Sequence, residues 1–182
     1  MYRAAQQILA EIDRVLLNVD PTQIDDLLDA IVASNLVTVY GLGREGLVMK
    51  SFAMRLMHVG VNVAVVGDMT TPPLGPGDLF LVCCGPGYLS TVLALTGVAK
   101  QAGAKVLMIT AQPQADLAKR ADQLLVLPAQ TMAEKEGSSS EQAMGSAFEQ
   151  SLWILFDAVL PTLQQRLGQT ADDLRRRHTN LE

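Results

Sequence analysis

Residues 36–46 read Leu-Val-Thr-Val-Tyr-Gly-Leu-Gly-Arg-Glu-Gly, and this stretch decides the fold. An apolar, β-branched run ends at Tyr40, closely spaced glycines follow, and a helical pattern begins at once. A strand, a tight turn and a helix in this order direct backbone N–H groups and the positive end of the helix to one place, which favours an anion site. Glu45, however, puts a carboxylate where an anion would otherwise bind.

The same alternation continues along the chain. Apolar, β-branched segments predict strands, and segments with helical spacing predict helices between them. The predicted strands span 36–40, 62–66, 79–84, 105–110 and 123–127, and the predicted helices between them span 44–59, 88–102 and 115–120. This order favours an α/β fold with one doubly wound, five-stranded parallel sheet of flavodoxin-like type, flanked by helices on both faces. Ligands of such sheets bind at the carboxyl ends of the strands.

Helices are also predicted on both sides of this core. Two amphipathic helices occupy 1–34, and Asp20 followed by Pro21 is typical of a helix start. A polar, irregular stretch at 129–140 precedes a long helix over 142–167 and a short last helix. We therefore expect a single domain over 1–182, with an N-terminal helical extension at 1–34, an α/β core at 35–128 and C-terminal helices at 141–182.

Composition narrows the classes of protein. The chain has 182 residues, of which 49% are hydrophobic, so it can bury a substantial core. Its net charge of −5 argues against a nucleic-acid binder. Residues 1–10 are polar and amphipathic, and no apolar run reaches about 18 residues, so we expect a cytoplasmic protein without a membrane span. We expect no metal, because no His, Cys and Asp cluster has metal-ligand spacing.

The two cysteines, Cys83 and Cys84, are neighbours in a predicted strand. Adjacent strand residues point to opposite faces of a sheet, so a disulfide between them would be strained. We expect two buried thiols, as in proteins of a reducing compartment.

A dinucleotide site is one interpretation of the glycine loop. Gly41, Gly43 and Gly46 follow a strand and open a helix, and Asp68 lies at the end of the next strand. Two observations weigh against this interpretation: two helices precede the first strand, and the third strand ends in its own glycine turn at 85–87. Two neighbouring turns favour a compact ligand held between them.

Five segments, spread over nearly the whole chain, carry a second pattern. They are Gly-Leu-Gly-Arg-Glu-Gly at 41–46, Phe-Ala-Met-Arg-Leu-Met-His at 52–58, Val-Gly-Asp-Met-Thr-Thr-Pro at 66–72, Met-Gly-Ser-Ala-Phe-Glu at 144–149 and Arg-His-Thr-Asn-Leu at 177–181. This pattern resembles the sugar isomerase (SIS) domain family, and within it the 6-phospho-3-hexuloisomerases. The resemblance implies an SIS-type sheet and no cofactor.

The resemblance implies that a 3-ketohexose 6-phosphate and a 2-ketohexose 6-phosphate are interconverted through an enediol. Such a reaction needs a base and groups that polarise a carbonyl. Glu149 matches the family's glutamate base; the alternative is a first-turn glutamate that complements the helix dipole. Arg44 matches the loop arginine that binds a substrate oxygen; the alternative is an ion pair with Glu45 or Asp68.

The remaining matches have two interpretations each. His58 is a proton shuttle or a cap that complements a helix dipole. His178 lies in a tail that, by resemblance, packs on a neighbouring subunit and completes its site; the alternative is a solvated tail residue. Thr70 and Thr71 offer hydroxyls to the ligand or cap a turn before Pro72. The resemblance also implies a homotetramer, built as a dimer of dimers.

The chain departs from the family in both loops. The family carries Gly-x-Gly-Arg-Ser-Gly and Ser-Gly-Ser-Gly-x-Thr, whose hydroxyls bind the phosphate, whereas this chain has Glu45, Cys84, Pro86 and Leu89 there. A hydrogen bond to a charged group contributes about 1.5–3 kcal/mol. Glu45 adds repulsion of about 4 kcal/mol at a separation of about 4 Å and a dielectric of about 20. We interpret this as an altered phosphate-binding site.

The expected site is therefore defined as follows. The catalytic residues are Glu149, His178 and His58, and the substrate-binding residues are Gly43, Arg44, Glu45, Thr70, Thr71, Cys84, Gly85, Gly87, Ser90 and Thr91. The favoured function is a ketose or aldose isomerase of sugar phosphates or related sugars, with Glu149 as base. The alternative is a binding or sensor module for carbohydrate derivatives without catalysis. A dinucleotide-dependent oxidoreductase is the third possibility.

Overall fold

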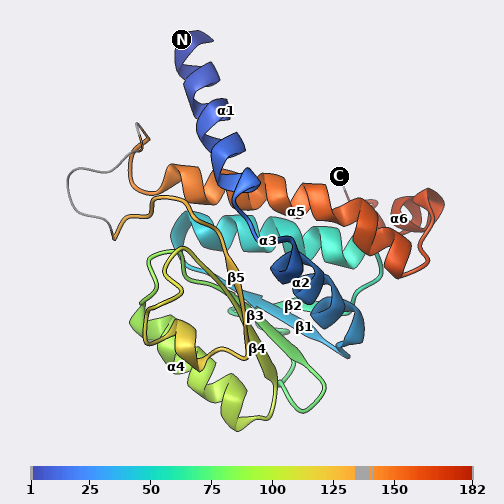
Figure 1. Cartoon of the computed structure of the whole chain (residues 1–182). Helices are drawn as coiled ribbons and strands as arrows, with labels where there is room; N and C mark the ends of the chain where they lie inside the picture. Colours follow the sequence, from blue (N-terminus) through green and yellow to red (C-terminus); the bar gives the residue numbers. More distant parts are fainter. Residues whose placement is uncertain (1, 134–139, 141, 182) are drawn as a thin grey trace.

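The computed structural model describes residues 2–133, 140 and 142–181. Five parallel strands form one sheet in the order β2-β1-β3-β4-β5, with helices on both faces (Figure 1). The strands are β1 (Val37–Tyr40), β2 (Val63–Val65), β3 (Leu79–Cys83), β4 (Lys105–Thr110) and β5 (Gln123–Val126). The predicted doubly wound α/β fold is confirmed. The strand order reverses between β1 and β3, and at such a point the turns after two adjacent strands diverge and leave room for a ligand.

The helices form two layers around the sheet. They are α1 (Tyr2–Leu17), α2 (Pro21–Ala33), α3 (Gly43–His58), α4 (Ser90–Gln101), the short 3₁₀ helix η1 (Ala118–Arg120), α5 (Ser146–Arg166) and α6 (Ala171–Arg177). Helices α2, α3 and α5 lie on one side of the sheet and α4 on the other, while α1 projects away from the body (Figure 1). Of the helices in the described part of the chain, none is long and apolar enough to cross a membrane.

The alternation of side chains along the strands creates two apolar cores. Cys83 belongs to the core between the sheet and α2, α3 and α5, and Cys84 belongs to the core beneath α4. Both thiols are buried and unpaired with each other, as predicted from their adjacency. A strand that is buried on both faces has a continuous run of apolar residues. This explains why the sequence pattern predicted β3.

Several boundaries differ from the predicted ones. Helix α5 begins at Ser146 and not at position 142, because Met144 and Gly145 have φ angles of 56° and 81°, which no right-handed helix contains. Helix α4 begins two residues late, after Gly87 with φ of 80°. The predicted helix over 115–120 is only the 3₁₀ turn η1. The irregular stretch predicted at 129–140 lies partly outside the described residues, since 134–139 are not described.

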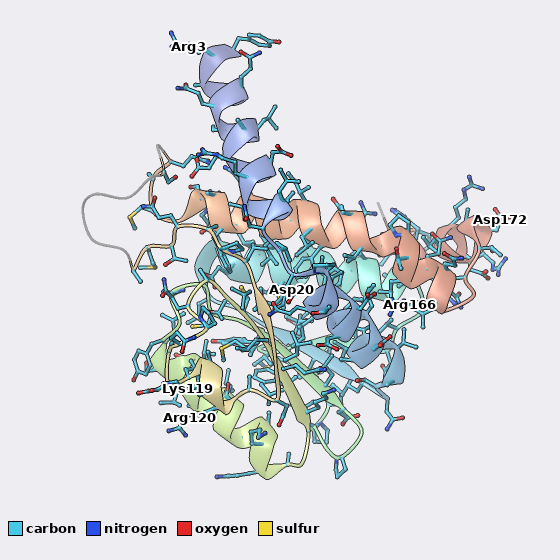
Figure 2. The ribbon with its side chains drawn as sticks, viewed as in Figure 1. Arg3, Asp20, Lys119, Arg120, Arg166 and Asp172 are labelled. Atoms are coloured by element: carbon cyan, nitrogen blue, oxygen red, sulfur yellow. The ribbon has the colours of Figure 1, made fainter. Side chains whose placement is uncertain are left out.

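Helices α3 and α5 run side by side in the same direction, which places their N-termini together. The rings of Phe52 and Phe156 stack with centroids 3.8 Å apart and planes 4° from parallel. Further along, Arg55 pairs with Asp157 at 3.7 Å. At the far end of α5, Arg166 lies beside α2 and donates to two of its carboxylates, Asp25 and Asp29 (Figure 2). The first turns of α3 and α5 therefore meet at the carboxyl edge of the sheet.

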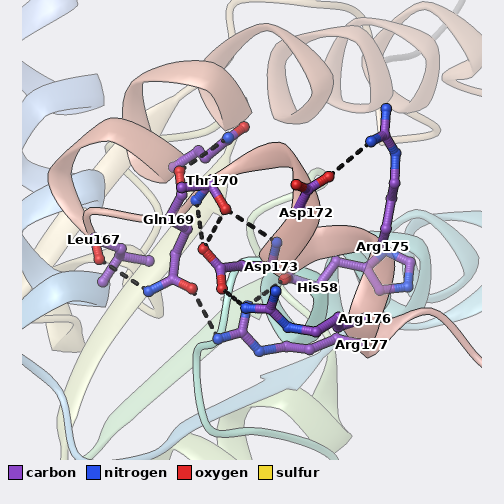
Figure 3. Close-up of polar contacts among 10 residues, drawn as sticks. His58, Leu167, Gln169, Thr170, Asp172, Asp173, Arg175, Arg176 and Arg177 are labelled. Carbon is purple, nitrogen blue, oxygen red and sulfur yellow. Dashed lines mark hydrogen bonds and ion pairs between the residues drawn. The ribbon is translucent and has the colours of Figure 1, made fainter.

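Helix α6 closes the other end of α3. Thr170 is its N-cap and forms a reciprocal capping box with Asp173. Arg177, at the end of α6, donates to the carbonyl of His58 at 3.0 Å and to Gln169 Oε1 at 2.8 Å (Figure 3). A guanidinium on the last carbonyls of a helix satisfies an unpaired acceptor and complements the helix dipole.

Candidate functional site

The β1–α3 turn is shaped by its glycines. Gly43 has φ of 56°, a conformation that side chains with a Cβ rarely adopt. A Cβ on Gly46 would lie 2.5 Å from the carbonyl oxygen of Gly41, so only glycine lets the helix approach the turn this closely. Backbone geometry alone therefore accounts for the Gly-x-Gly-x-x-Gly spacing, and the spacing carries no independent argument for a dinucleotide.

Glu45 crosses from the first turn of α3 to the turn after β3. The same carboxylate oxygen, Oε2, accepts two hydrogen bonds: one from the Gly85 N–H at 3.0 Å and one from the Cys83 thiol at 3.3 Å. A Cβ on Gly85 would lie 2.7 Å from the other carboxylate oxygen and 3.0 Å from the Phe148 ring. The side chain thus occupies the switch point between β1 and β3, where the sequence predicted a ligand anion.

Burial governs the protonation of these groups. The pKa of the Glu45 carboxyl is raised, because burial disfavours its charge and Glu149 adds repulsion, while the bonds from Gly85 and Cys83 act in the opposite direction. Burial and the neighbouring Glu45 raise the pKa of Cys84 to about 12 and hold the pKa of Cys83 well above its usual range. Both thiols therefore stay protonated near neutral pH and are poor nucleophiles.

Arg44 and Glu149 form an ion pair between the first turns of α3 and α5. The arginine side chain is 63% exposed and the glutamate side chain 13%, so the pair lies at the surface end of the site. It borders a groove of about 470 Å³ between α1, α3 and α5 that is otherwise mostly apolar, with Ile12 and Trp153 among its lining residues. Of the pairings weighed for Arg44, with Glu45 or Asp68, the structure contains neither as a salt bridge within the described residues.

These residues form one charged cluster, which we call the carboxyl-edge cluster: Arg44, Glu45 and Glu149. Two carboxylates and one guanidinium give a net charge of −1 when both acids are ionised. Half-buried Glu45 accepts from Gly85 and Cys83, whereas Glu149 pairs with Arg44. Different surroundings are how proteins assign different proton-transfer roles to two carboxyls. In the described part of the chain, no three His, Cys, Asp or Glu side chains gather as metal ligands would.

The first backbone N–H groups of the turn between β3 and α4 donate hydrogen bonds to other groups of the protein. The Gly85 N–H donates to Glu45, and the Gly87 N–H donates to the carbonyl of Cys84 at 3.0 Å. Pro86 has no N–H to offer. Ser90 and Thr91 are exposed in the first turn of α4, whose N-cap residue makes no side-chain capping bond.

The predicted threonines lie beyond β2. The Thr71 hydroxyl shares its single proton between the carbonyls of Val65, at 2.6 Å, and Asp68, at 2.7 Å, so it stabilises the turn after the strand. Thr70 is exposed beside a groove of about 380 Å³ along β2, which Thr71 also lines. For Thr71 the structure has the turn-capping arrangement that the sequence left open as an alternative.

The two histidines lie at the opposite end of α3. The rings of His58 and His178 stack with centroids 5.3 Å apart. Helix α3 has 16 residues, so at a rise of 1.5 Å per residue His58 is about 22 Å from the start of the helix. Within one chain, the structure therefore does not bring the histidines to Arg44 and Glu149.

Comparison with known proteins places this architecture in a family. The model of the SIS domain matches residues 30–154. The chain belongs to the SIS domain family. A Mycobacterium gastri protein named 3-hexulose-6-phosphate isomerase is 41% identical over 172 residues, which cover 94% of this chain and 86% of that protein. A Bacillus subtilis protein of the same name is 36% identical, covering 97% of this chain and 96% of that one.

A solved structure gives the same picture. The crystal structure of MJ1247 from Methanococcus jannaschii, from which a 3-hexulose-6-phosphate isomerase function was inferred, superposes with a TM-score of 0.85 at 27% identity. The match covers 99% of both chains. The SIS fold therefore extends over this whole chain, including the helices before and after the matched family model.

Two contacts of the site were not predicted from the sequence. Cys83 is a hydrogen-bond donor to Glu45, and the Phe148 ring lies against Gly85. Glu45 is 40 residues from Gly85 along the chain, so no local pattern joins them. The only signal was indirect: Gly85 begins a glycine turn at a strand end, and Phe148 directly precedes the candidate base.

Proposed function

We propose that this SIS protein is an intramolecular sugar isomerase that interconverts ketose or aldose forms through an enediol, with Glu149 as the base. The observation that carries the proposal is the Arg44–Glu149 pair, which joins the first turns of α3 and α5 at the carboxyl edge of the β1–β3 switch point. The names of the full-length relatives, 3-hexulose-6-phosphate isomerase, support this reaction class.

The pair supplies the two groups that the reaction needs. Glu149 removes the proton from the hydroxyl-bearing carbon next to the carbonyl and returns it to the former carbonyl carbon. The hydroxyl proton passes between the two oxygens, so the enediol collapses to the isomer with no net gain or loss of atoms. Arg44 leaves Glu149 on substrate binding and stabilises the negative charge that develops on the carbonyl oxygen.

The histidines enter the proposal through a second subunit. His58 lies about 21 Å along α3 from Arg44, and His178 stacks on it, so a role of these histidines in proton transfer requires the site of a neighbour. For this role we propose a homotetramer, a dimer of dimers, as the working form. A monomer on a calibrated sizing column would remove both histidines from the mechanism. The buried, unpaired thiols suit a cytoplasmic location.

Turnover of a Glu149→Gln variant tests the base. With fructose 6-phosphate, fructose and related ketoses and aldoses as substrates, we expect the product formed per minute to fall at least about 100-fold, which is the usual contribution of a general base. The melting temperature should stay nearly unchanged. Asp157→Asn is the control, because it removes another acid from α5, an exposed one that lies about two turns away. Equal turnover in the wild-type protein and Glu149→Gln would remove Glu149 from the mechanism.

A second function, binding without catalysis, is favoured by one observation. Arg44 is engaged by Glu149 and the Gly85 amide by Glu45, so the polar groups of the site satisfy one another without substrate. A ligand that binds the folded state raises the melting temperature. Sugars that raise it but are not isomerised by the wild-type protein would support a sensor; isomerised sugars would support the enzyme.

A further inference from the structure

The backbone N–H of Gly85, at the start of the β3–α4 turn, already has a hydrogen-bond acceptor within the protein. The Gly85 N–H points at the switch point between β1 and β3, and its acceptor is the carboxylate of Glu45 at 3.0 Å. The Cys83 thiol donates to the same oxygen at 3.3 Å. The carboxylate is therefore held from two sides, at the place where the open end of a parallel sheet receives a ligand.

The surroundings of Glu45 are built around this arrangement. The neighbours of Gly85 leave no space for a Cβ at this position. Such an atom would lie 2.7 Å from a carboxylate oxygen of Glu45 and 3.0 Å from the ring of Phe148. Cys83 is buried and its raised pKa keeps the thiol protonated, so it remains a donor to the carboxylate. The backbone, the thiol and the aromatic ring thus all fit a carboxylate that reaches across to the turn.

The first amides of the same turn are engaged within the protein and are not free for a second anion, whereas Ser90 and Thr91 are exposed further along. Pro86 lacks an N–H, and the Gly87 N–H is used by the carbonyl of Cys84. Glu149 contributes to the raised pKa of Glu45, so its charge also disfavours an anion beside that carboxylate. Arg44, the cation of the cluster, already pairs with one of them. A phosphoryl dianion at this turn would be repelled, whereas a hydroxyl or an ammonium group would find acceptors.

We propose that Glu45 determines the substrate class of the site: it receives a hydrogen-bond donor of the ligand, a hydroxyl or an amino group, and excludes a phosphoryl group from the β3–α4 turn. The ligand is then a sugar or amino sugar that carries no phosphate at the end that binds this turn. The inference deepens the proposed isomerase, because it concerns the same site, and it has a readout of its own in binding.

Inorganic sulfate is the direct probe, because it is a tetrahedral dianion whose charge is constant near neutral pH. We expect titration calorimetry to give sulfate binding at least tenfold tighter for Glu45→Ser than for the wild-type protein. Glu45→Gln, which keeps an acceptor for the Gly85 N–H but removes the charge, should also bind more tightly than wild type. Asp157→Asn controls for the loss of any negative charge near these helices, and should bind sulfate as the wild-type protein does.

The proposal is overturned if neither Glu45 variant gains sulfate affinity, whether the proteins all bind the ion or none does. Wild-type binding of fructose 6-phosphate as tight as that of Glu45→Ser would overturn it as well. A thermal-shift panel gives the positive test: fructose and glucosamine should stabilise the wild-type protein more than their 6-phosphates do, and Glu45→Ser should reverse that order. Fructose and glucosamine separate a hydroxyl from an amino group as the donor.

Failure of this inference is distinguishable from failure of the proposed function. The isomerase proposal depends on turnover in Glu149→Gln, in which Glu45 is intact. The ligand proposal depends on sulfate affinity in the Glu45 variants, which needs no turnover at all. A protein with turnover that depends on Glu149 and unchanged sulfate affinity would keep the first proposal and reject the second.

Discussion

Both ends of helix α3 carry titratable side chains, but the two ends lie in different parts of the fold. At its N-terminus, Arg44 and Glu45 meet Glu149 at the carboxyl edge of the sheet. At its C-terminus, His58 stacks on His178 and its carbonyl accepts from Arg177. Only the first end lies at the switch point of the strand order, where a parallel sheet leaves room for a ligand. Titratable residues on one helix therefore do not make one site, since position relative to the sheet decides.

The largest expected effect on stability comes from the ring contact that packs helix α3 against helix α5. Phe52 is buried between α3 and α5 and stacks on Phe156. Phe52→Ala should lower the free energy of unfolding by about 3–5 kcal/mol, because it removes a buried ring and leaves a cavity. Urea unfolding followed by circular dichroism measures this loss. The control is Met54→Ala on the same helix, where the side chain is 46% exposed and the change should stay within about 0.5 kcal/mol. Equal losses in the two variants would contradict the packing described.

A glycine pair sharpens the account of the N-terminal end. Gly85→Ala should destabilise the protein by about 1–3 kcal/mol, because the new methyl group lies against Glu45 and Phe148. Gly97→Ala in α4 is the matched control: nothing lies within 4 Å of its Cβ position, so the helix should gain about 0.5–1 kcal/mol. Thermal unfolding of the two variants should thus move in opposite directions. A shift of the same sign in both would argue against a tight Gly85–Glu45 contact.

At the C-terminal end, Arg177 provides the equivalent test. Arg177→Ala removes the donor to the carbonyl of His58 and should cost about 1–2 kcal/mol, since the group is only half-buried. Chemical denaturation gives this value. Arg175→Ala removes an exposed arginine that pairs within α6, so its effect should be close to zero. If Arg175→Ala proved the more costly of the two, the docking of α6 on α3 would be wrong.

The smallest expected effect is a pH dependence that belongs to Glu45. Its pKa is higher in the folded than in the unfolded chain, mainly through burial, so folding takes up a proton. This contribution to stability is fully present below the unfolded pKa and is lost as the pH rises through the folded pKa. Between about pH 7 and about pH 5, the melting temperature of the wild-type protein should therefore rise relative to that of Glu45→Gln. A constant difference over this range would contradict the raised pKa.

The sequence predicted what local patterns determine. The strands appeared as β-branched runs, and Asp20 before Pro21 predicted the N-cap of α2, where the Asp20 side chain accepts from the Thr22 N–H. The start of α5 was predicted four residues early, because a methionine with positive φ, Met144, has no sequence signal. Local pattern thus gave the elements better than their ends.

The site was predicted only in part, because its contacts join distant segments. The sequence picked out Arg44 and Glu149 through a family resemblance, but their pairing spans 105 residues and was not foreseen. It placed a carboxylate at the anion position, and the acceptance of the Gly85 amide by Glu45 agrees with that placement. The distance of His58 from this cluster follows from the length of α3, which the helical pattern of the sequence predicted but the family pattern did not use.

Proton exchange at carbon is the most direct test of the central idea, that the N-terminal end of α3 is the reactive one. In D₂O, an enzyme that forms an enediol replaces the hydrogen next to the sugar carbonyl by deuterium, which ¹H NMR detects without waiting for net product. We predict exchange with the wild-type protein and loss of it in Glu149→Gln, while Asp157→Asn exchanges at the wild-type rate. Exchange that continues in Glu149→Gln would contradict the account.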